Sequence, residues 1–302
     1  MEKNEKFTLG YRNAANLNAE SSFPYFVRTA ENQIFSAGDV GFGVFHWHED
    51  LQFIYVLEGS ACVKTLEEEV IIQAGEGVFT NSGVIHYSIS KSKPCSYRLF
   101  RFPERFLNFY GGSPAEEMTR RVTDNSGIEL IPLIKSEQWC NDTLPLLQQL
   151  VKLEEGKERN QMYPYDVLAT LSQIWQVILH HIEIPQKTAD DPISIRMRAF
   201  LEFIENNYED DITLEMLAAS AGVSKTEALR CFRQRLQTTP YRYLIDVRLS
   251  KAAELLLQTG LPVGEIAERA GFHQQSYFGK RFREKTGMTP LEYRGDRARD
   301  IE

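Results

Sequence analysis

The chain has 302 residues and a formal net charge of −8, with 42% hydrophobic and 25% charged residues. This composition is typical of a soluble globular protein of about two domains. The first ten residues lack the apolar core of a signal peptide, and no run reaches the roughly 18 apolar residues of a membrane span. The four cysteines form no CxxC pair, which argues against a zinc finger or a disulfide framework. We therefore expect a cytoplasmic protein with no membrane partner.

The first 132 residues are predicted to form a β-domain. Six short segments are rich in β-branched and aromatic residues and are punctuated by Gly, Asn, Ser or Pro. They are FGVFHWH (42–48), LQFIYVLEG (51–59), SACVKTL (60–66), EVIIQAGEGVFT (69–80), GVIHYSIS (83–90) and SYRLFRF (96–102). Close spacing of strands without helices between them is typical of a sandwich or a barrel.

The first of these segments contains two histidines, His46 and His48. Because side chains alternate between the faces of a strand, both imidazoles are predicted to point the same way, while Trp47 points the other way and packs. Two imidazoles on one face resemble half of a metal site, but they can equally hydrogen-bond a small polar molecule. His180 and His181 end a predicted helix, where we expect surface residues.

Residues 136–156 and 163–183 have the apolar spacing of two amphipathic helices. In the second helix one apolar stripe recurs in steps of three and four: Leu168, Leu171, Trp175 and Ile178. We interpret residues 133–184 as a helical segment that joins two copies of the chain in a homodimer. Residues 185–192 contain two prolines and no periodicity, so they are interpreted as a linker between domains.

Residues 193–302 are predicted to be helical, and this part of the chain repeats itself. LAASAGVSKTEALRCFRQRLQTTPYRYL from Leu217 aligns with IAERAGFHQQSYFGKRFREKTGMTPLEYR from Ile266. The matched pairs include Ala218 with Ala267, Gly222 with Gly271, Phe232 with Phe282, and Pro240 with Pro290. An internal repeat of this length indicates a duplicated structural unit.

Each copy has the pattern of a helix-turn-helix. A short helix ends at a glycine, which readily takes the positive φ of such a turn, and Ser224 can cap the helix that follows in the first copy. Between the copies, residues 241–258 are predicted to form one helix about 27 Å long at 1.5 Å per residue. A helix of that length can set two recognition helices in successive major grooves, about 34 Å apart.

The distribution of charge also favours DNA over the alternative, a plain helical bundle. Residues 193–302 carry a formal charge of +1, whereas the rest of the chain carries −9. Residues 223–251 alone contain seven basic side chains and two acidic ones. A local positive stripe is what a polyphosphate partner requires.

At these residues the chain resembles the DNA-binding domain of the AraC/XylS family of bacterial transcription regulators. Residues 266–294 are similar to the family signature throughout, whereas the first copy departs from it at Ala228, Leu229 and Gln237. The resemblance implies an all-α double helix-turn-helix, with double-stranded DNA and RNA polymerase as partners and activation of transcription as the outcome.

The amino-terminal half is similar to a cupin barrel, the usual sensor domain of that family. His46, His48 and Gln52 match the first cupin motif, with glutamine where metal-binding cupins usually carry glutamate, and residues 75–86 fit the second, which ends at His86. The resemblance implies that these four side chains converge. Because Gln52 lacks the charge of a carboxylate, we expect them to bind a small polar effector, such as a sugar, and we expect no metal, cofactor or catalytic residue.

We therefore predict a multi-domain α and β protein. A cupin-like β-barrel with flanking helices occupies residues 1–132 and 133–184, a linker 185–192, and a double helix-turn-helix 193–302. The predicted function is effector-responsive, sequence-specific regulation of transcription. A cupin enzyme with an appended helical module, using zinc, iron or nickel, is the alternative.

The DNA contacts are predicted on the two recognition helices. The residues expected to reach base edges are Thr226, Arg230, Gln275, Ser276 and Lys280. The residues expected to bind phosphates are Arg233, Arg281, Arg283 and Lys285.

Overall fold

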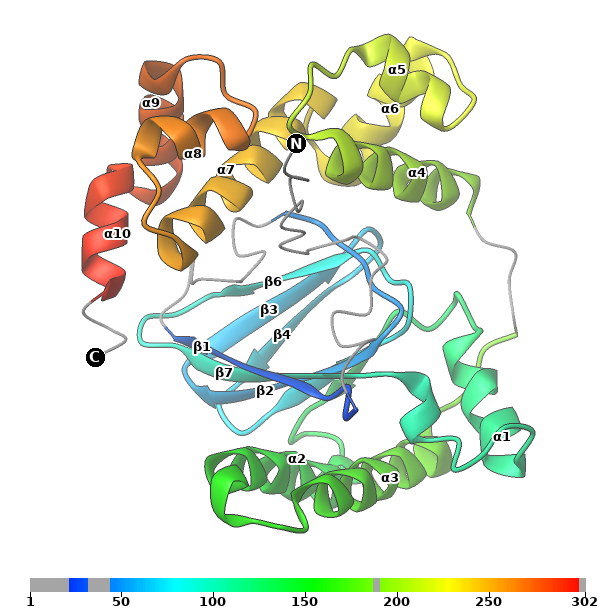
Figure 1. Cartoon of the computed structure of the whole chain (residues 1–302). Coiled ribbons are helices and arrows are strands. Elements are labelled where there is room, and N and C mark those ends of the chain that lie inside the picture. Colours follow the sequence, from blue (N-terminus) through cyan, green and yellow to red (C-terminus); the bar gives the residue numbers. More distant parts are fainter. Residues whose placement is uncertain (1–21, 32–43, 187–190, 299–302) are drawn as a thin grey trace, which may run out of the picture.

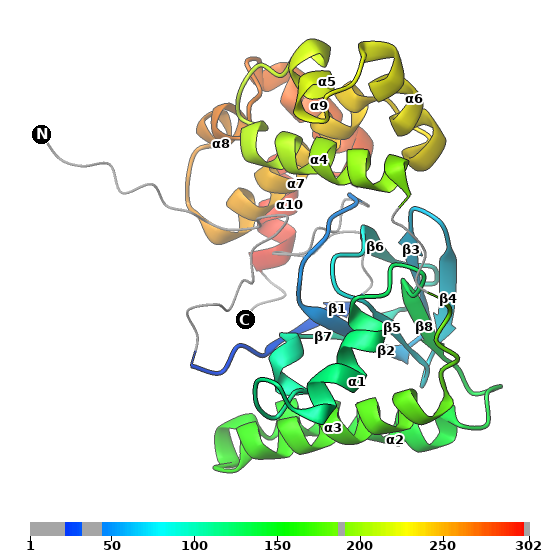
Figure 2. The same ribbon diagram turned by 90° about the vertical axis from the view of Figure 1, so that its right-hand side faces the viewer.

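A computed structural model of the chain describes residues 22–31, 44–186 and 191–298. These residues form a β-rich amino-terminal domain and a helical carboxy-terminal domain (Figure 1). The helical domain lies over one side of the β-strands, and two long helices of the amino-terminal domain cover the opposite side (Figures 1 and 2). Within the described ranges, no helix has both the length and the apolar character needed to span a bilayer.

The strands of the described residues form two antiparallel sheets. The larger sheet has the order β1-β7-β2-β5-β8, with bounds β1 (Phe26–Glu31), β7 (Ser96–Phe102), β2 (Leu51–Glu58), β5 (Gly77–Thr80) and β8 (Leu130–Leu133). The smaller sheet has the order β4-β3-β6, with bounds β4 (Glu69–Gln73), β3 (Ser60–Thr65) and β6 (His86–Ser90). The prediction of a cupin-like β-domain followed by a helical domain is confirmed.

The two faces of the larger sheet belong to different cores. On its outer face, Phe53 and Phe79 pack in one cluster with Trp175 and other residues of α2 (Cys140–Glu155) and α3 (Tyr163–His181). On its inner face, Ile54, Val78 and Leu99 pack with residues of the smaller sheet. Because strand side chains alternate, Gln52, Thr80 and Arg101 also point to the inner face, into the barrel.

The apolar stripe of α3 is buried by packing within the same chain. Leu171, Trp175 and Ile178 expose 0%, 3% and 0% of their surface, and all three belong to the core beneath the larger sheet. Leu168 is half-buried. The stripe therefore packs on the sheet of its own chain, and the homodimer expected through residues 133–184 stays a prediction.

Other departures from the sequence-based prediction concern short elements. The segment expected as a strand at 42–48 forms, in its described part, a single bridge between His46 and His86. The elements that were not predicted are β1, β8, α1 (Pro114–Thr123) and two 3-10 turns, η1 (Glu104–Phe106) and η2 (Lys157–Arg159). Part of the predicted linker, 187–190, lies outside the described residues.

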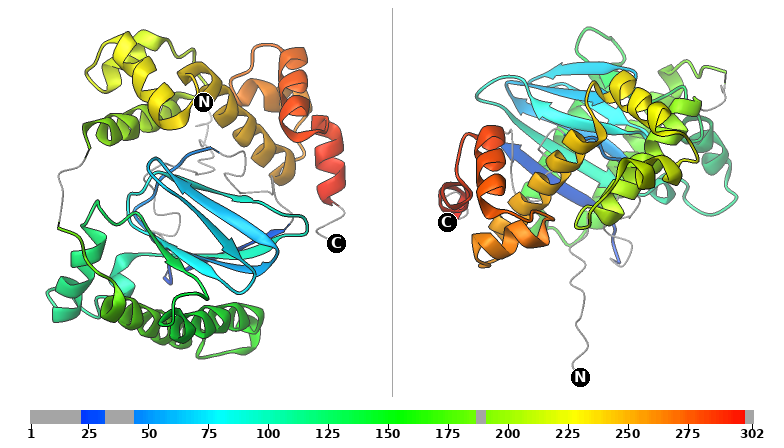
Figure 3. Two further views of the ribbon diagram at one scale, coloured as in Figure 1. Left: turned by 180° about the vertical axis from the view of Figure 1, so that it is seen from behind. Right: turned by 90° about the horizontal axis from the view of Figure 1, so that it is seen from above.

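The carboxy-terminal domain contains the expected repeat. Its helices are α4 (Pro192–Asn207), α5 (Leu214–Ser220), α6 (Lys225–Leu236), α7 (Pro240–Gln258), α8 (Val263–Arg269), α9 (Gln275–Thr286) and α10 (Pro290–Ala298). Two helix-turn-helix units, α5–α6 and α8–α9, lie on either side of α7 (Figure 3). Their turns contain Gly222 at φ 64° and Gly271 at φ 80°, and Ser224 caps α6 by accepting from the amide of Glu227. Phe232 and Phe282, a matched pair of the repeat, are both fully buried.

The two domains share an apolar core. Phe45, Trp47 and Ile85 of the barrel rim belong to the same buried cluster as the helices of the carboxy-terminal domain. The Tyr243 hydroxyl on α7 donates to the Phe45 carbonyl at 2.6 Å. Trp47 is 8% exposed, which confirms that it packs, and the surface on which it packs is the interdomain interface.

Candidate effector site and DNA interface

The three cupin-motif histidines meet inside the barrel. The backbones of His46 and His86 pair with each other, at 2.9 and 2.8 Å, and His48 lies two residues further along the same segment. Their rings lie 4.6–5.8 Å apart between centroids, and one ring nitrogen of each lies within 4.8 Å of the others. The predicted convergence of His46, His48 and His86 therefore holds in the structure.

The histidines are held in the neutral form. Burial, together with neighbouring positive groups that include Arg101, places the pKa of His46 and His48 well below 6.5. Burial likewise lowers the pKa of His86 to about 4. The imidazoles therefore stay uncharged at neutral pH, each with one N–H donor and one acceptor nitrogen.

Backbone contacts fix the tautomer of two rings. His48 Nδ1 lies 2.8 Å from the Asp50 carbonyl, and His86 Nδ1 lies 2.8 Å from the Val84 carbonyl. Because a carbonyl only accepts, both Nδ1 atoms must carry the proton. Both Nε2 atoms are consequently unprotonated and can only accept hydrogen bonds within the barrel.

A row of polar side chains on the larger sheet faces these rings. Gln52 on β2 pairs with Thr80 on β5 and with Arg101 on β7, so the three lie side by side on the inner face. Gln52 Nε2 lies 3.2 Å from His86 Nε2, to which it donates. In this cluster, the buried side-chain atoms without a hydrogen-bond partner among the described residues include His48 Nε2, Gln52 Oε1 and Thr80 Oγ1.

Two members of this row, Thr80 and Arg101, were not among the predicted site residues. Both are buried, at 0% and 3% exposure. The available signal was their position within predicted strands, but assigning them to the barrel interior required the register with Gln52, which no local pattern supplies.

The same atoms allow a test of whether a metal fits. Three imidazole nitrogens at this spacing could hold zinc, iron or nickel, and the backbone carbonyls of Asp50 and Val84 already orient two of the rings. Against a metal, Gln52 contributes no negative charge, and the Arg101 guanidinium adds a positive charge close to the cluster. The donor set is therefore compatible with a cation, whereas the electrostatics oppose one.

The predicted DNA contacts lie on the second helix of each helix-turn-helix, α6 and α9. Those that are solvent-exposed are Thr226, Arg230, Arg233, Gln275, Ser276, Lys280 and Arg283. Arg281 and Lys285 are half-buried and pair with Glu284 and Asp246, at 2.7 and 3.0 Å. The assignment of individual side chains to bases or phosphates remains a prediction.

Three basic side chains of residues 223–251 form contacts within the protein. Arg235 bridges Glu67 of the barrel and Asp191, at 2.5 Å each. Arg248 donates to the carbonyls of Tyr208 and Asp210, and Lys251 forms a buried ion pair with Glu205. These three cations hold the fold together, so only part of the local positive charge faces a partner.

Each of the two domains matches a known protein family. The chain matches the helix-turn-helix domain family over residues 217–296 and the cupin domain family over residues 33–100. It is 27% identical over 256 residues to the HTH-type transcriptional regulator YdeC of Bacillus subtilis, which covers 84% of this chain and 87% of that protein. It is 20% identical over 231 residues to the lactose operon transcription activator of Staphylococcus xylosus, covering 74% and 82%.

The solved structure of ToxT from Vibrio cholerae with a bound unsaturated fatty acid is similar in fold. The TM-score is 0.52 and the identity 15%, over 89% of this chain and 94% of that one. A cupin barrel joined to a double helix-turn-helix defines a class of DNA-binding transcriptional regulators. With one domain of each kind, the chain is similar to the transcriptional regulators of the AraC family.

Proposed function

We propose that this regulator responds to a small hydroxyl-bearing molecule, such as a sugar or another polyol, bound inside the cupin barrel. The observation that supports the proposal is a pair of buried acceptors without a donor, His48 Nε2 and Gln52 Oε1. A buried unpaired polar group costs about 1–3 kcal/mol, so a ligand that supplies donors gains that energy. Hydroxyls can donate to these atoms and also accept from other polar side chains of the barrel.

The proposed effector contacts are the predicted set His46, His48, Gln52 and His86. We add Thr80 and Arg101, because strand register places both beside Gln52 on the same inner face. All but His46 expose 3% of their surface or less, so a ligand bound there would be enclosed and its polar groups would have to be matched.

In this proposal the barrel performs no reaction. A ligand that binds one interdomain arrangement better than another shifts the equilibrium by the difference in affinity, so binding alone is sufficient for regulation. The chain would thus act in the cytoplasm as a non-enzymatic activator, as a homodimer on paired DNA sites and in contact with RNA polymerase. The similarity to a protein named as an activator of a lactose operon supports activation and a sugar effector.

Substitution of Gln52 tests the site directly. The full-length chain is screened by thermal shift against a panel of sugars and polyols, and the compound that stabilises it most is retained. The variant Gln52→Leu preserves size but removes both polar atoms, so we expect at least a tenfold loss of affinity, since a hydrogen-bond network of this kind contributes about 1.5 kcal/mol or more. Gln148→Leu, on the exposed face of α2, is the matched control and should bind normally. Equal binding by both variants would refute the proposed contacts.

A three-imidazole metal centre is the second candidate, favoured by the spacing of the histidine nitrogens. Elemental analysis of the untagged, full-length chain distinguishes the two. We expect well under one equivalent of transition metal after purification. One tightly held equivalent, lost in a His48→Ala variant, would instead establish the metal centre and reopen the enzymatic alternative.

A further inference from the structure

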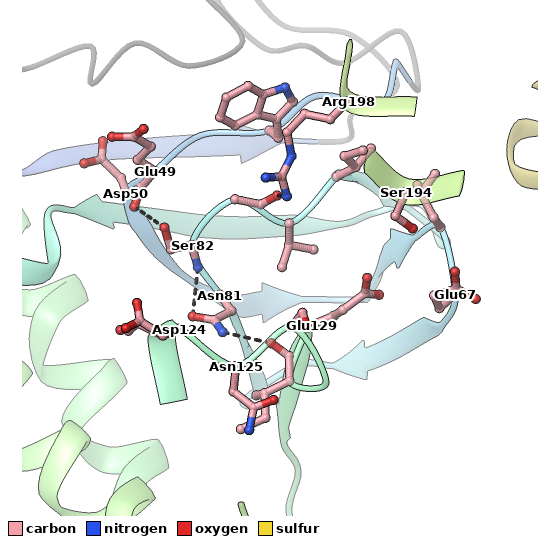
Figure 4. A pocket seen from close by; sticks show the side chains of 18 of the residues that line it. Glu49, Asp50, Glu67, Asn81, Ser82, Asp124, Asn125, Glu129, Ser194 and Arg198 are labelled. Atoms are coloured by element: carbon pink, nitrogen blue, oxygen red, sulfur yellow. Dashed lines mark hydrogen bonds between the residues drawn. The ribbon is translucent and has the colours of Figure 1, made fainter. Parts of the chain in front are cut away.

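A cavity lies between the two domains. It has a volume of about 840 Å³. The barrel rim at Asn81–Ile85 and the loop at 124–129 form two of its walls, and Ser194 and Arg198 of α4 form the third (Figure 4). None of the three histidines lines it. A ligand here would touch both domains at once.

The cavity is strongly acidic. Seven carboxylates and three guanidinium groups line it, which gives a formal charge of −4. Two of those guanidiniums have structural partners, since Arg198 donates to the Gly83 carbonyl at 2.8 Å and Arg235 pairs with Glu67 and Asp191. The negative charge of the lining is therefore only partly compensated by the protein.

Asp50 is a buried carboxylate in the lining of the cavity. It is 3% exposed and lines the cavity, and among the described residues its carboxylate has no hydrogen bond or ion pair. Burial raises its pKa to about 6, although Arg101 and Arg105 oppose that shift. A buried carboxylate facing a cavity without a hydrogen-bond donor is an incomplete interaction, which a cationic ligand would complete.

The carboxylates are distributed over two sides of the cavity. Figure 4 shows Glu49, Asp50 and Asp124 on one side and Glu67 and Glu129 on the other, with Asn81 and Ser82 between them. Apolar side chains, among them Val84 and Ile128, also contribute to the lining. This is an arrangement of two anionic ends joined by a mixed surface.

We propose that the cavity binds an aliphatic diamine or polyamine, with one ammonium group at the Asp50 side and another at the Glu129 side. The methylene chain would lie along the apolar part of the lining, and the ammonium groups would donate to the carboxylates. Because both domains form the walls, such a ligand favours the arrangement in which they are in contact. This site goes beyond the proposed effector site and does not depend on it.

Calorimetric titration of the full-length chain with 1,4-diaminobutane tests the proposal. The comparison ligands are 1-aminobutane, which has one ammonium group, and 1,4-butanediol, which has none, all at equal ionic strength. We expect the diamine to bind, the monoamine to bind at least about tenfold more weakly, and the diol to give no heat, because a hydrogen bond to a charged group contributes about 1.5–3 kcal/mol. Equal affinity for diamine and monoamine would contradict the two-ended site.

Variants locate the binding. Asp50→Asn and Glu129→Gln preserve shape, and each should weaken the diamine about tenfold or more. Glu158→Gln, exposed on η2 away from the cavity, is the matched control and should bind as the wild type does. Gln52→Leu should also retain diamine binding, so failure of the barrel site and failure of this site are distinguishable. Uniform affinity across all four variants, or no heat at millimolar diamine, overturns the proposal.

Discussion

At the scale of single residues, two sets of buried polar groups in the amino-terminal domain have opposite electrostatic character. Inside the barrel, neutral histidines lie with Gln52 near the positive charge of Arg101. In the cavity between the domains, carboxylates such as Asp50 dominate. The barrel interior therefore suits uncharged or anionic molecules that carry hydroxyls, whereas the cavity suits cations.

The buried histidines make stability depend on pH. Their folded-state pKa is lowered, so below about pH 6.5 the unfolded chain binds more protons, and the free energy of unfolding must fall as pH falls. For His86 alone the loss between pH 7 and pH 5 is about 2 kcal/mol at 1.36 kcal/mol per pKa unit. Urea denaturation at the two pH values measures it. His86→Gln should flatten the dependence, while His180→Gln, at an exposed position, should not; identical slopes would show that His86 ionises freely in the fold.

At the scale of elements, the two recognition helices differ in what they offer to DNA. On α6, Arg230 is held by Glu227 at 2.6 Å and by Gln234 at 3.0 Å, and Leu229 exposes 39% of its surface where the family often has a polar residue. On α9, Gln275 and Ser276 are the first two residues of the helix, and both are exposed to solvent. An apolar Leu229 can contact a thymine methyl, whereas the polar start of α9 suits hydrogen bonding to base edges.

Binding of DNA by variants of Arg230 and Arg283 separates base recognition from phosphate contact. Arg230→Ala should relax sequence preference by about 1–3 kcal/mol at one position, because a bidentate contact to guanine is lost. Arg283→Ala should weaken all duplexes alike and reduce the salt dependence by about one counterion. Both are measured by titrating full-length chain against specific and scrambled duplexes at several salt concentrations. If both variants lose affinity uniformly across sequences, the assignment of roles is wrong.

Elements with a strong local pattern were predictable from the sequence, and those defined by distant partners were not. The helices α2, α3 and α7 follow from apolar periodicity, and the turns at Gly222 and Gly271 follow from the repeat. The segment around His46 has the composition of a strand, yet its described part pairs with β6 only at His86, because strand composition does not supply a partner. Thr80 and Arg101 join the site through register, and the acidic cavity exists only when α4 lies against the barrel rim.

At the scale of the whole molecule, the interface between the domains is built for a specific arrangement. The interface contains an apolar core that includes Phe45, and the Tyr243 hydroxyl donates a hydrogen bond to the Phe45 carbonyl. Arg235 adds ion pairs with Glu67 and Asp191. Arg198 on α4 adds a contact with the face of Trp47 at 5.2 Å. We therefore expect a ligand at either proposed site to change how the two helix-turn-helix units are presented, because the barrel contacts the domain that carries them.

An exposed apolar groove lies beside α3, away from the buried stripe of that helix. Phe109 exposes 73% of its side chain and Met118 exposes 49%, and they line a groove of about 340 Å³ with residues of α3 such as Gln176. Phe109 also has a φ of 59°, a backbone conformation that is costly for a bulky residue. The predicted homodimer can form through this groove.

We therefore expect the full-length chain to sediment as a dimer at tens of micromolar, with Phe109 and Met118 in the contact. Phe109→Glu would place a charge in an apolar interface, so it should shift the population to monomer, because an unpaired buried charge costs several kcal/mol. Tyr165→Glu is the matched control, since Tyr165 is equally exposed at 72% but lies outside the groove. A wild-type monomer at that concentration, or dissociation by both variants, would contradict the assigned surface. Loss of the dimer should weaken binding to paired half-sites far more than binding to one, because the second contact is then no longer intramolecular.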